Sequence, residues 1–98
     1  MKGAGRITDT LTDGDAIAVG SSDVFINNLA ASRNGDLTTG HDSYPPSPMI
    51  ATTGTVYANN ILILRKGDLN TPHTRTILPF DTHSGSVVIG SGNVFIGD

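Results

Sequence analysis

The stretch Val24–Leu37 (VFINNLAASRNGDL) is followed, 32 residues later, by a second copy, Val56–Leu69 (VYANNILILRKGDL). The valine, the Asn-Asn pair, the arginine and the Gly-Asp-Leu run coincide without a gap. Asparagine tolerates positive φ, which a two-residue type I′ turn needs at both central positions. Each copy therefore predicts a β-hairpin that turns at its Asn-Asn pair, followed by a second sharp bend at Asn34-Gly35 or Lys66-Gly67.

A third copy is divided between the two ends of the chain. The segment Gly90–Asp98 repeats Gly20–Asn28 as far as the turn, and no return strand follows it. The missing half is indicated near the other end by an Arg-x-x-Asp motif, which occurs at 6–9, 33–36 and 65–68. We therefore expect Gly3–Arg6 to lie beside Val94–Ile96, which would close three units into a ring and leave fewer exposed strand edges.

The composition predicts one small all-β domain over residues 1–98. The chain has no Glu, Gln or Trp, whereas Gly and Thr are abundant and Val and Ile recur. These are residues of strands and turns rather than of helices. The net charge of −3 and the scattered basic residues disfavour nucleic acid as a partner. The chain has no cysteine, which excludes disulfides and thiolate metal ligands.

Three units in a ring predict pseudo-threefold symmetry. The links between them run from Asp9 to Val24, from Asp36 to Val56 and from Asp68 to Val94, and each is longer than the one before. The second link contains Tyr44–Pro48 (YPPSP), which is compatible with neither a helix nor a central strand. Because unequal insertions in repeat proteins gather on one face, we expect the links on one side and the hairpins on the other.

These repeats resemble the PAAR-repeat proteins, which form the tips of contractile-tail phage spikes and type VI secretion spikes. The matching residues are Gly-Ser-x-x-Val-Phe-Ile-Asn-Asn, then Ala-Ala-x-Arg-x-Gly-Asp, then a histidine in the following link. The resemblance implies a short cone whose base sits on a trimeric β-helical spike, with a metal ion near its apex. Without an added domain, the chain is most similar to a stand-alone tip of a phage baseplate spike in the virion; secretion on a type VI spike is the alternative.

Three histidines are the candidate metal ligands. His41 and His73 each follow the repeat aspartate by five residues, and His83 lies in the longest link. From the residues alone, ordinary surface or hydrogen-bonded histidines are the favoured interpretation, because there is no cysteine and no tight His-x-x-x-His spacing. Family members often use three histidines and one cysteine, so the resemblance implies His41, His73 and His83 as ligands. Asp81 is the candidate fourth ligand, with Asp42 and Asp13 as other nearby acids. Imidazole suits zinc, our first choice, and iron, the alternative.

The sequence predicts a structural protein rather than an enzyme. No Gly-x-Ser-x-Gly elbow or phosphate-binding loop is present, although a metal-dependent hydrolase and a small Thr-rich domain that binds carbohydrate or a cell surface remain alternatives. We expect one copy of the protein, as one pseudo-threefold ring, to bind each spike trimer. We also expect it to contact the target outer membrane transiently. Its expected base is formed by the repeat-equivalent residues Val24, Phe25, Val56, Tyr57, Val94 and Phe95.

Overall fold

The computed structural model describes residues 2–51 and 55–97, and all the regular structure in this part of the chain is β-strand. The all-β class is therefore confirmed. The strands are two residues long, and turns and single β-bridges connect them. Their bounds are β1 (Lys2–Gly3), β2 (Phe25–Ile26), β3 (Leu29–Ala30), β4 (Met49–Ile50), β5 (Tyr57–Ala58), β6 (Ile61–Leu62), β7 (Leu69–Asn70), β8 (His73–Thr74), β9 (Thr82–His83) and β10 (Phe95–Ile96).

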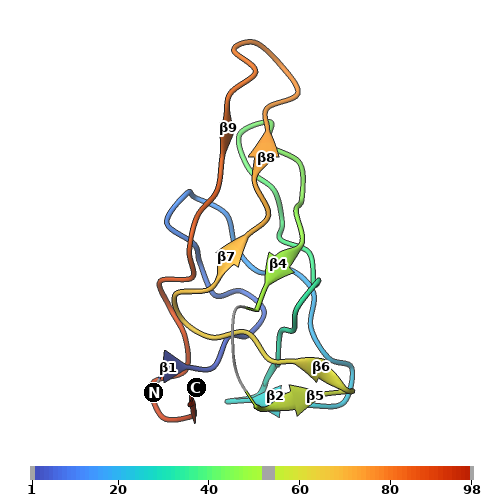
Figure 1. Ribbon diagram of the computed structural model, residues 1–98, viewed down its shortest axis with the longest axis vertical. Coiled ribbons are helices and arrows are strands. Elements are labelled where there is room, and N and C mark those ends of the chain that lie inside the picture. Colours follow the sequence, from blue (N-terminus) through green and yellow to red (C-terminus); the bar gives the residue numbers. More distant parts are fainter. Residues whose placement is uncertain (1, 52–54, 98) are drawn as a thin grey trace.

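The first and last strands pair with each other, as the split third copy predicts. Strands β1 and β10 are antiparallel, with Lys2 opposite Ile96 and Gly3 opposite Phe95 (Figure 1). The amide of Ala4 extends the pairing by donating to the carbonyl of Val94 at 2.9 Å. The two ends of the chain together thus form the third hairpin-like unit.

The two intact hairpins turn at their Asn-Asn pairs. Strands β2 and β3 are antiparallel, and so are β5 and β6. Asn27 and Asn28 have φ of 54° and 66°, and Asn59 and Asn60 have φ of 55° and 64°. Positive φ at both central positions is the type I′ requirement, so the local turn chemistry predicted these elements correctly.

A closed cycle of backbone hydrogen bonds joins the three units. Gly5 donates to Leu64 at 2.8 Å, Leu64 donates to Ser32 at 2.9 Å, and Ser32 donates back to Gly5 at 3.1 Å. Each of these residues directly precedes an arginine of the Arg-x-x-Asp motif. Every unit is therefore both donor and acceptor, and none is left at an open edge of the cycle.

The Arg-x-x-Asp motifs have a structural role. The carboxylate of Asp9 accepts hydrogen bonds from the backbone amide and the guanidinium of Arg6, and Asp36 does the same for Arg33. Arg6 then reaches the side-chain oxygen of Asn27 at 2.9 Å. Arg33 likewise reaches the side-chain oxygen of Asn59 at 3.0 Å, so these two motifs each cap their own turn and tie it to a hairpin, which agrees with an interpretation as turn and edge residues.

Two hydrophobic clusters fill the interior. One contains repeat-equivalent residues from all three units: Ala4, Ala31 and Ile63, with Ile26, Ala58 and Ile96. The other consists of Leu11, Ile17, Met49, Leu64 and Val87. Neither cluster includes a described residue between 70 and 84.

The molecule is elongated, with extents of 40 × 24 × 22 Å. Figure 1 shows β1, β2, β5 and β6 together at one end, which we call the broad end. The β8–β9 hairpin projects at the opposite end, which we call the narrow end. The links rise between these ends, and the candidate site lies among them.

Candidate metal site

Two of the three histidines face each other across the β8–β9 pair. His73 is directly opposite His83 in the antiparallel register. Side chains of directly opposed residues project from the same face of a two-stranded sheet. The longest link therefore brings two imidazoles together by folding back on itself.

A tight turn places the third histidine. His41 and Tyr44 exchange backbone hydrogen bonds of 3.0 and 2.6 Å. The two residues between them, Asp42 and Ser43, have φ of 41° and 66°. This turn directs the Nε2 atom of His41 to 3.0 Å from Nε2 of His83.

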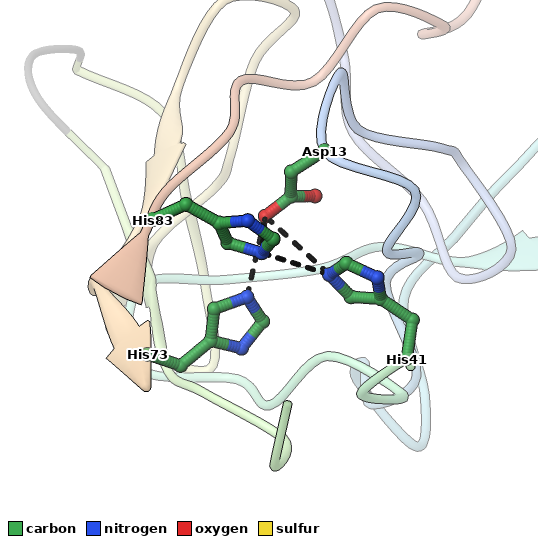
Figure 2. Close-up of side chains that lie close together, drawn as sticks. All are labelled: Asp13, His41, His73 and His83. Carbon is green, nitrogen blue, oxygen red and sulfur yellow. Dashed lines mark hydrogen bonds and ion pairs between the residues drawn. The ribbon is translucent and has the colours of Figure 1, made fainter. Parts of the chain in front are cut away.

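Asp13 completes the cluster. Its Oδ2 atom lies 3.3 Å from Nε2 of His73, 3.4 Å from Nε2 of His83 and 3.9 Å from Nε2 of His41 (Figure 2). Candidate donor atoms of all four residues lie within 4.8 Å of one another. Figure 2 shows the three imidazoles and the carboxylate converging from different segments of the chain.

Asp13 is fixed in place by its surroundings. Its Oδ1 accepts the amide of Asp15 at 3.1 Å, and its Oδ2 accepts the side-chain amide of Asn70 at 3.2 Å. Gly85 packs so closely that a Cβ there would lie 2.7 Å from Cγ of Asp13. A larger residue at 85 would therefore push the carboxylate out of position.

The pKa of Asp13 is lowered from its ordinary value. Burial alone would raise it, but the hydrogen bonds from Asp15 and Asn70 and the charges of His41 and His83 outweigh that effect. The carboxylate is thus held ionised, as a metal ligand must be. Its contribution to stability is present above the unfolded pKa of about 3.9 and is lost as the pH falls through the lowered folded value.

The spacing of the ligand atoms fits a tetrahedral ion. Ligands about 2.0–2.1 Å from zinc, at the corners of a tetrahedron, lie about 3.3–3.4 Å apart. The separations of 3.0, 3.3, 3.4 and 3.9 Å among these donor atoms bracket that value. These are four of the six separations, and all the candidate ligand atoms lie within 4.8 Å of one another, so the imidazoles and the carboxylate can converge on one ion.

His73 provides an independent test of fit. Its Nδ1 lies 2.8 Å from the carbonyl oxygen of Pro45, which can only accept, so Nδ1 is the protonated nitrogen. In the neutral imidazole, Nε2 then carries the lone pair, and among the described residues this buried atom has no hydrogen-bond partner, although Asp13 Oδ2 lies 3.3 Å away. A buried imidazole with one nitrogen fixed by a carbonyl and the other free is the arrangement found in metal-binding histidines.

Tyr44 covers one side of the cluster. Its buried ring has its centroid 3.8 Å from that of His83, 5.0 Å from that of His41 and 5.0 Å from that of His73. Burial, together with the charge of Asp81, raises the pKa of the Tyr44 hydroxyl. That hydroxyl lies 3.5 Å from the Asp81 carboxylate. The aromatic ring thus restricts the orientations of all three imidazoles.

The structure brings together the three histidines predicted from the sequence, but the nearby carboxylate is that of Asp13. Asp81 is exposed and faces the hydroxyl of Tyr44 rather than the imidazoles. Asp42 pairs with Arg75 at 3.8 Å. The repeat contains a signal that points to Asp13. His41 follows the repeat aspartate Asp36 by five residues, and the position five residues after Asp9 is Gly14, which directly follows Asp13.

The residues of the predicted base are exposed at the broad end to different extents. The aromatic residues Phe25, Tyr57 and Phe95 are 59%, 58% and 49% exposed. The valines are less exposed, with Val56 at 39%, Val94 at 38% and Val24 packed against the first hydrophobic cluster.

Comparison with known proteins gives no identification. The chain matches no protein-family model, and no curated protein matches it in sequence. No helix among the described residues is long and apolar enough to cross a membrane.

Proposed function

We propose that this protein is a metal-stabilised structural tip, similar to PAAR-repeat proteins, that caps a trimeric β-helical spike. In this proposal one copy covers one trimer end and sharpens it for piercing a target cell envelope. The protein would act at the tip of a phage tail baseplate spike in the virion, with a type VI spike as the alternative location.

The exposed aromatic residues of the broad end are the observation that most supports a cap. Phe25, Tyr57 and Phe95 occupy equivalent positions in the three units and are each about half exposed or more. Large apolar side chains that cluster on a surface are typical of protein–protein interfaces. Each of these side chains belongs to one of the three units that the backbone hydrogen-bond cycle joins, and three such side chains suit a partner with three equivalent chains.

The metal would hold the links together. His41, His73, His83 and Asp13 offer four ligands, and a set of four protein ligands is typical of structural zinc, whereas catalytic sites keep a position open. Zinc is the proposed ion and iron the alternative. When bound, the ion would cross-link the three links at a level where the described residues between 70 and 84 belong to neither hydrophobic cluster, so its binding would contribute to folding free energy.

Measuring the mass of the complex with a trimeric β-helical spike tests the cap. We expect one copy per trimer, because one ring of three units matches one trimer axis. Phe25→Asp should abolish binding by placing a charge in the interface, without unfolding the free protein. Phe80→Asp is the matched control, because Phe80 is 60% exposed at the opposite end and Phe25 is 59% exposed.

Other outcomes would contradict this assembly. Three copies per trimer, or equal loss of binding in both variants, would refute the proposed geometry. Binding to a glycan but to no trimer, with Phe25→Asp abolishing it, would instead support the carbohydrate-binding alternative, in which exposed aromatic rings stack on sugars.

A further inference from the structure

The loop between β8 and β9 carries an exposed apolar group at the end of the molecule. Figure 1 shows this loop projecting beyond every other segment. Ile77 is 51% exposed, Leu78 is 76% exposed and Phe80 is 60% exposed. Exposed apolar side chains that occur together on one protruding loop indicate a binding surface. Single apolar side chains scattered over a surface do not.

Charged residues flank this loop, but the loop itself contains none. The five residues Thr76–Phe80 (TILPF) contain no charged side chain. Arg75 and Asp81 flank them directly, and Asp42 lies 3.8 Å from the Arg75 guanidinium. The loop thus has an apolar end and, where it joins the body, a rim with charges of both signs.

Hydrogen bonds hold the two strands together at the base of the loop, so the apolar side chains stay exposed at its end. The amide of Arg75 donates to the carbonyl of Asp81 at 2.8 Å, and the amide of Thr76 donates to the carbonyl of Ser43 at 2.9 Å. The hydroxyls of Thr74 and Thr82 lie 2.6 Å apart. Next along both strands come His73 and His83, so the loop stands on the candidate metal site.

We propose that Ile77, Leu78 and Phe80 form a lipid-inserting tip that enters the interfacial region of an electrically neutral bilayer. This inference deepens the proposed function, because it names the surface that would meet the target membrane. It does not require the spike trimer.

The shape of the loop and the charges at its rim favour a bilayer over a protein partner. A protruding apolar loop needs a matching pocket in a protein, and a second copy would present the same protruding loop, whereas lipid accommodates any apolar protrusion. The rim residues Arg75, Asp42 and Asp81 suit the paired charges of zwitterionic headgroups. Their excess of negative charge gives no attraction to anionic lipid.

A single introduced tryptophan tests the inference, since the natural chain has none. In the full-length Phe80→Trp protein mixed with phosphatidylcholine vesicles, we expect the tryptophan emission to shift to shorter wavelength. Brominated phosphatidylcholine should quench it. Raising the salt concentration should leave binding unchanged, because screening weakens charge attraction and not apolar burial.

Phe25→Trp is the matched control, because Phe25 is as exposed as Phe80 but lies at the broad end. Its emission should not shift. An unshifted Phe80→Trp spectrum, an equal shift in both variants, or binding restricted to anionic vesicles and lost in salt would each overturn the inference.

A second variant identifies the side chains responsible. Ile77→Ser combined with Leu78→Ser, in the Phe80→Trp background, should weaken vesicle binding by about a hundredfold, since burying each large apolar side chain contributes on the order of a factor of ten. Unchanged binding would overturn the inference. Metal content and trimer binding of the same variant should match those of the wild type, so failure of the lipid tip is distinguishable from failure of the cap.

Discussion

Asp13 and Asp81 are both aspartates close to the histidines, yet their surroundings give them different roles. Asp13 is held by Asp15 and Asn70 with an oxygen 3.3 Å from Nε2 of His73. Asp81 lies in the exposed end of a link, beside the Tyr44 hydroxyl. The two residues therefore form a matched pair for testing the metal site.

We expect Asp13→Asn to lower metal affinity on the order of tenfold or more, since a neutral amide is a poorer ligand than a carboxylate. Asn keeps the size of Asp and can still accept the Asp15 amide. Asp81→Asn should retain the metal at the wild-type ratio. Elemental analysis of the purified proteins measures both, and metal loss in Asp81→Asn with retention in Asp13→Asn would contradict the assignment.

Sequence reasoning reached the histidines but could not select the carboxylate. His41 and His73 occupy a repeated position, which is visible in the sequence, and His83 lies in the same link as His73. Which aspartate approaches them depends on the close packing of Gly85 against Asp13 and on a hydrogen bond from Asn70, 57 residues away in the chain. Contacts of that range are set by tertiary packing, which no local pattern encodes.

The short strands were predictable to different degrees at the scale of elements. The β2–β3 and β5–β6 hairpins follow from the Asn-Asn turns, because a two-residue turn fixes the register of its own strands. The β4–β7 pair joins Met49 to Asn70 across two different links. Neither link carries a turn signal that specifies this pairing.

The β1–β10 pair gives a test of ring closure. A Cβ at Gly3 would lie 2.4 Å from the backbone oxygen of Ser91, so Gly3→Ala must move the backbone. We expect a loss of about 1–3 kcal/mol in the free energy of unfolding, as for other overpacked sites. Thermal or urea unfolding measures it.

Gly92→Ala is the control for this substitution, because a Cβ at Gly92 meets nothing within 4 Å. It should change stability little. Equal stability of the two variants would mean that the terminal strands are not packed together in solution.

The whole molecule combines two means of support. The broad end and the middle are filled by hydrophobic clusters, whereas the described residues between 70 and 84 belong to neither cluster. That part of the chain is connected through the imidazoles, the Tyr44 ring and a few hydrogen bonds. Removal of the metal should therefore affect the two ends differently.

With a chelator present, we expect amide hydrogen exchange in residues 73–83 to accelerate on the order of tenfold or more, because local opening there is no longer opposed by the metal. Exchange in the β2–β3 and β5–β6 hairpins should change little. Re-adding zinc should restore protection. Equal acceleration at both ends would show instead that the metal supports the fold as one unit.

The pairing of β1 with β10 also has a consequence for how the protein is made. Ribosomes synthesise Lys2–Gly3 long before Phe95–Ile96, the strand with which it pairs. The hydrogen-bond cycle through Gly5, Ser32 and Leu64 likewise joins segments far apart in the chain. Such long-range closure is slow compared with hairpin formation. The nascent chain is therefore expected to carry formed hairpins and an unclosed ring until β10 leaves the ribosomal tunnel.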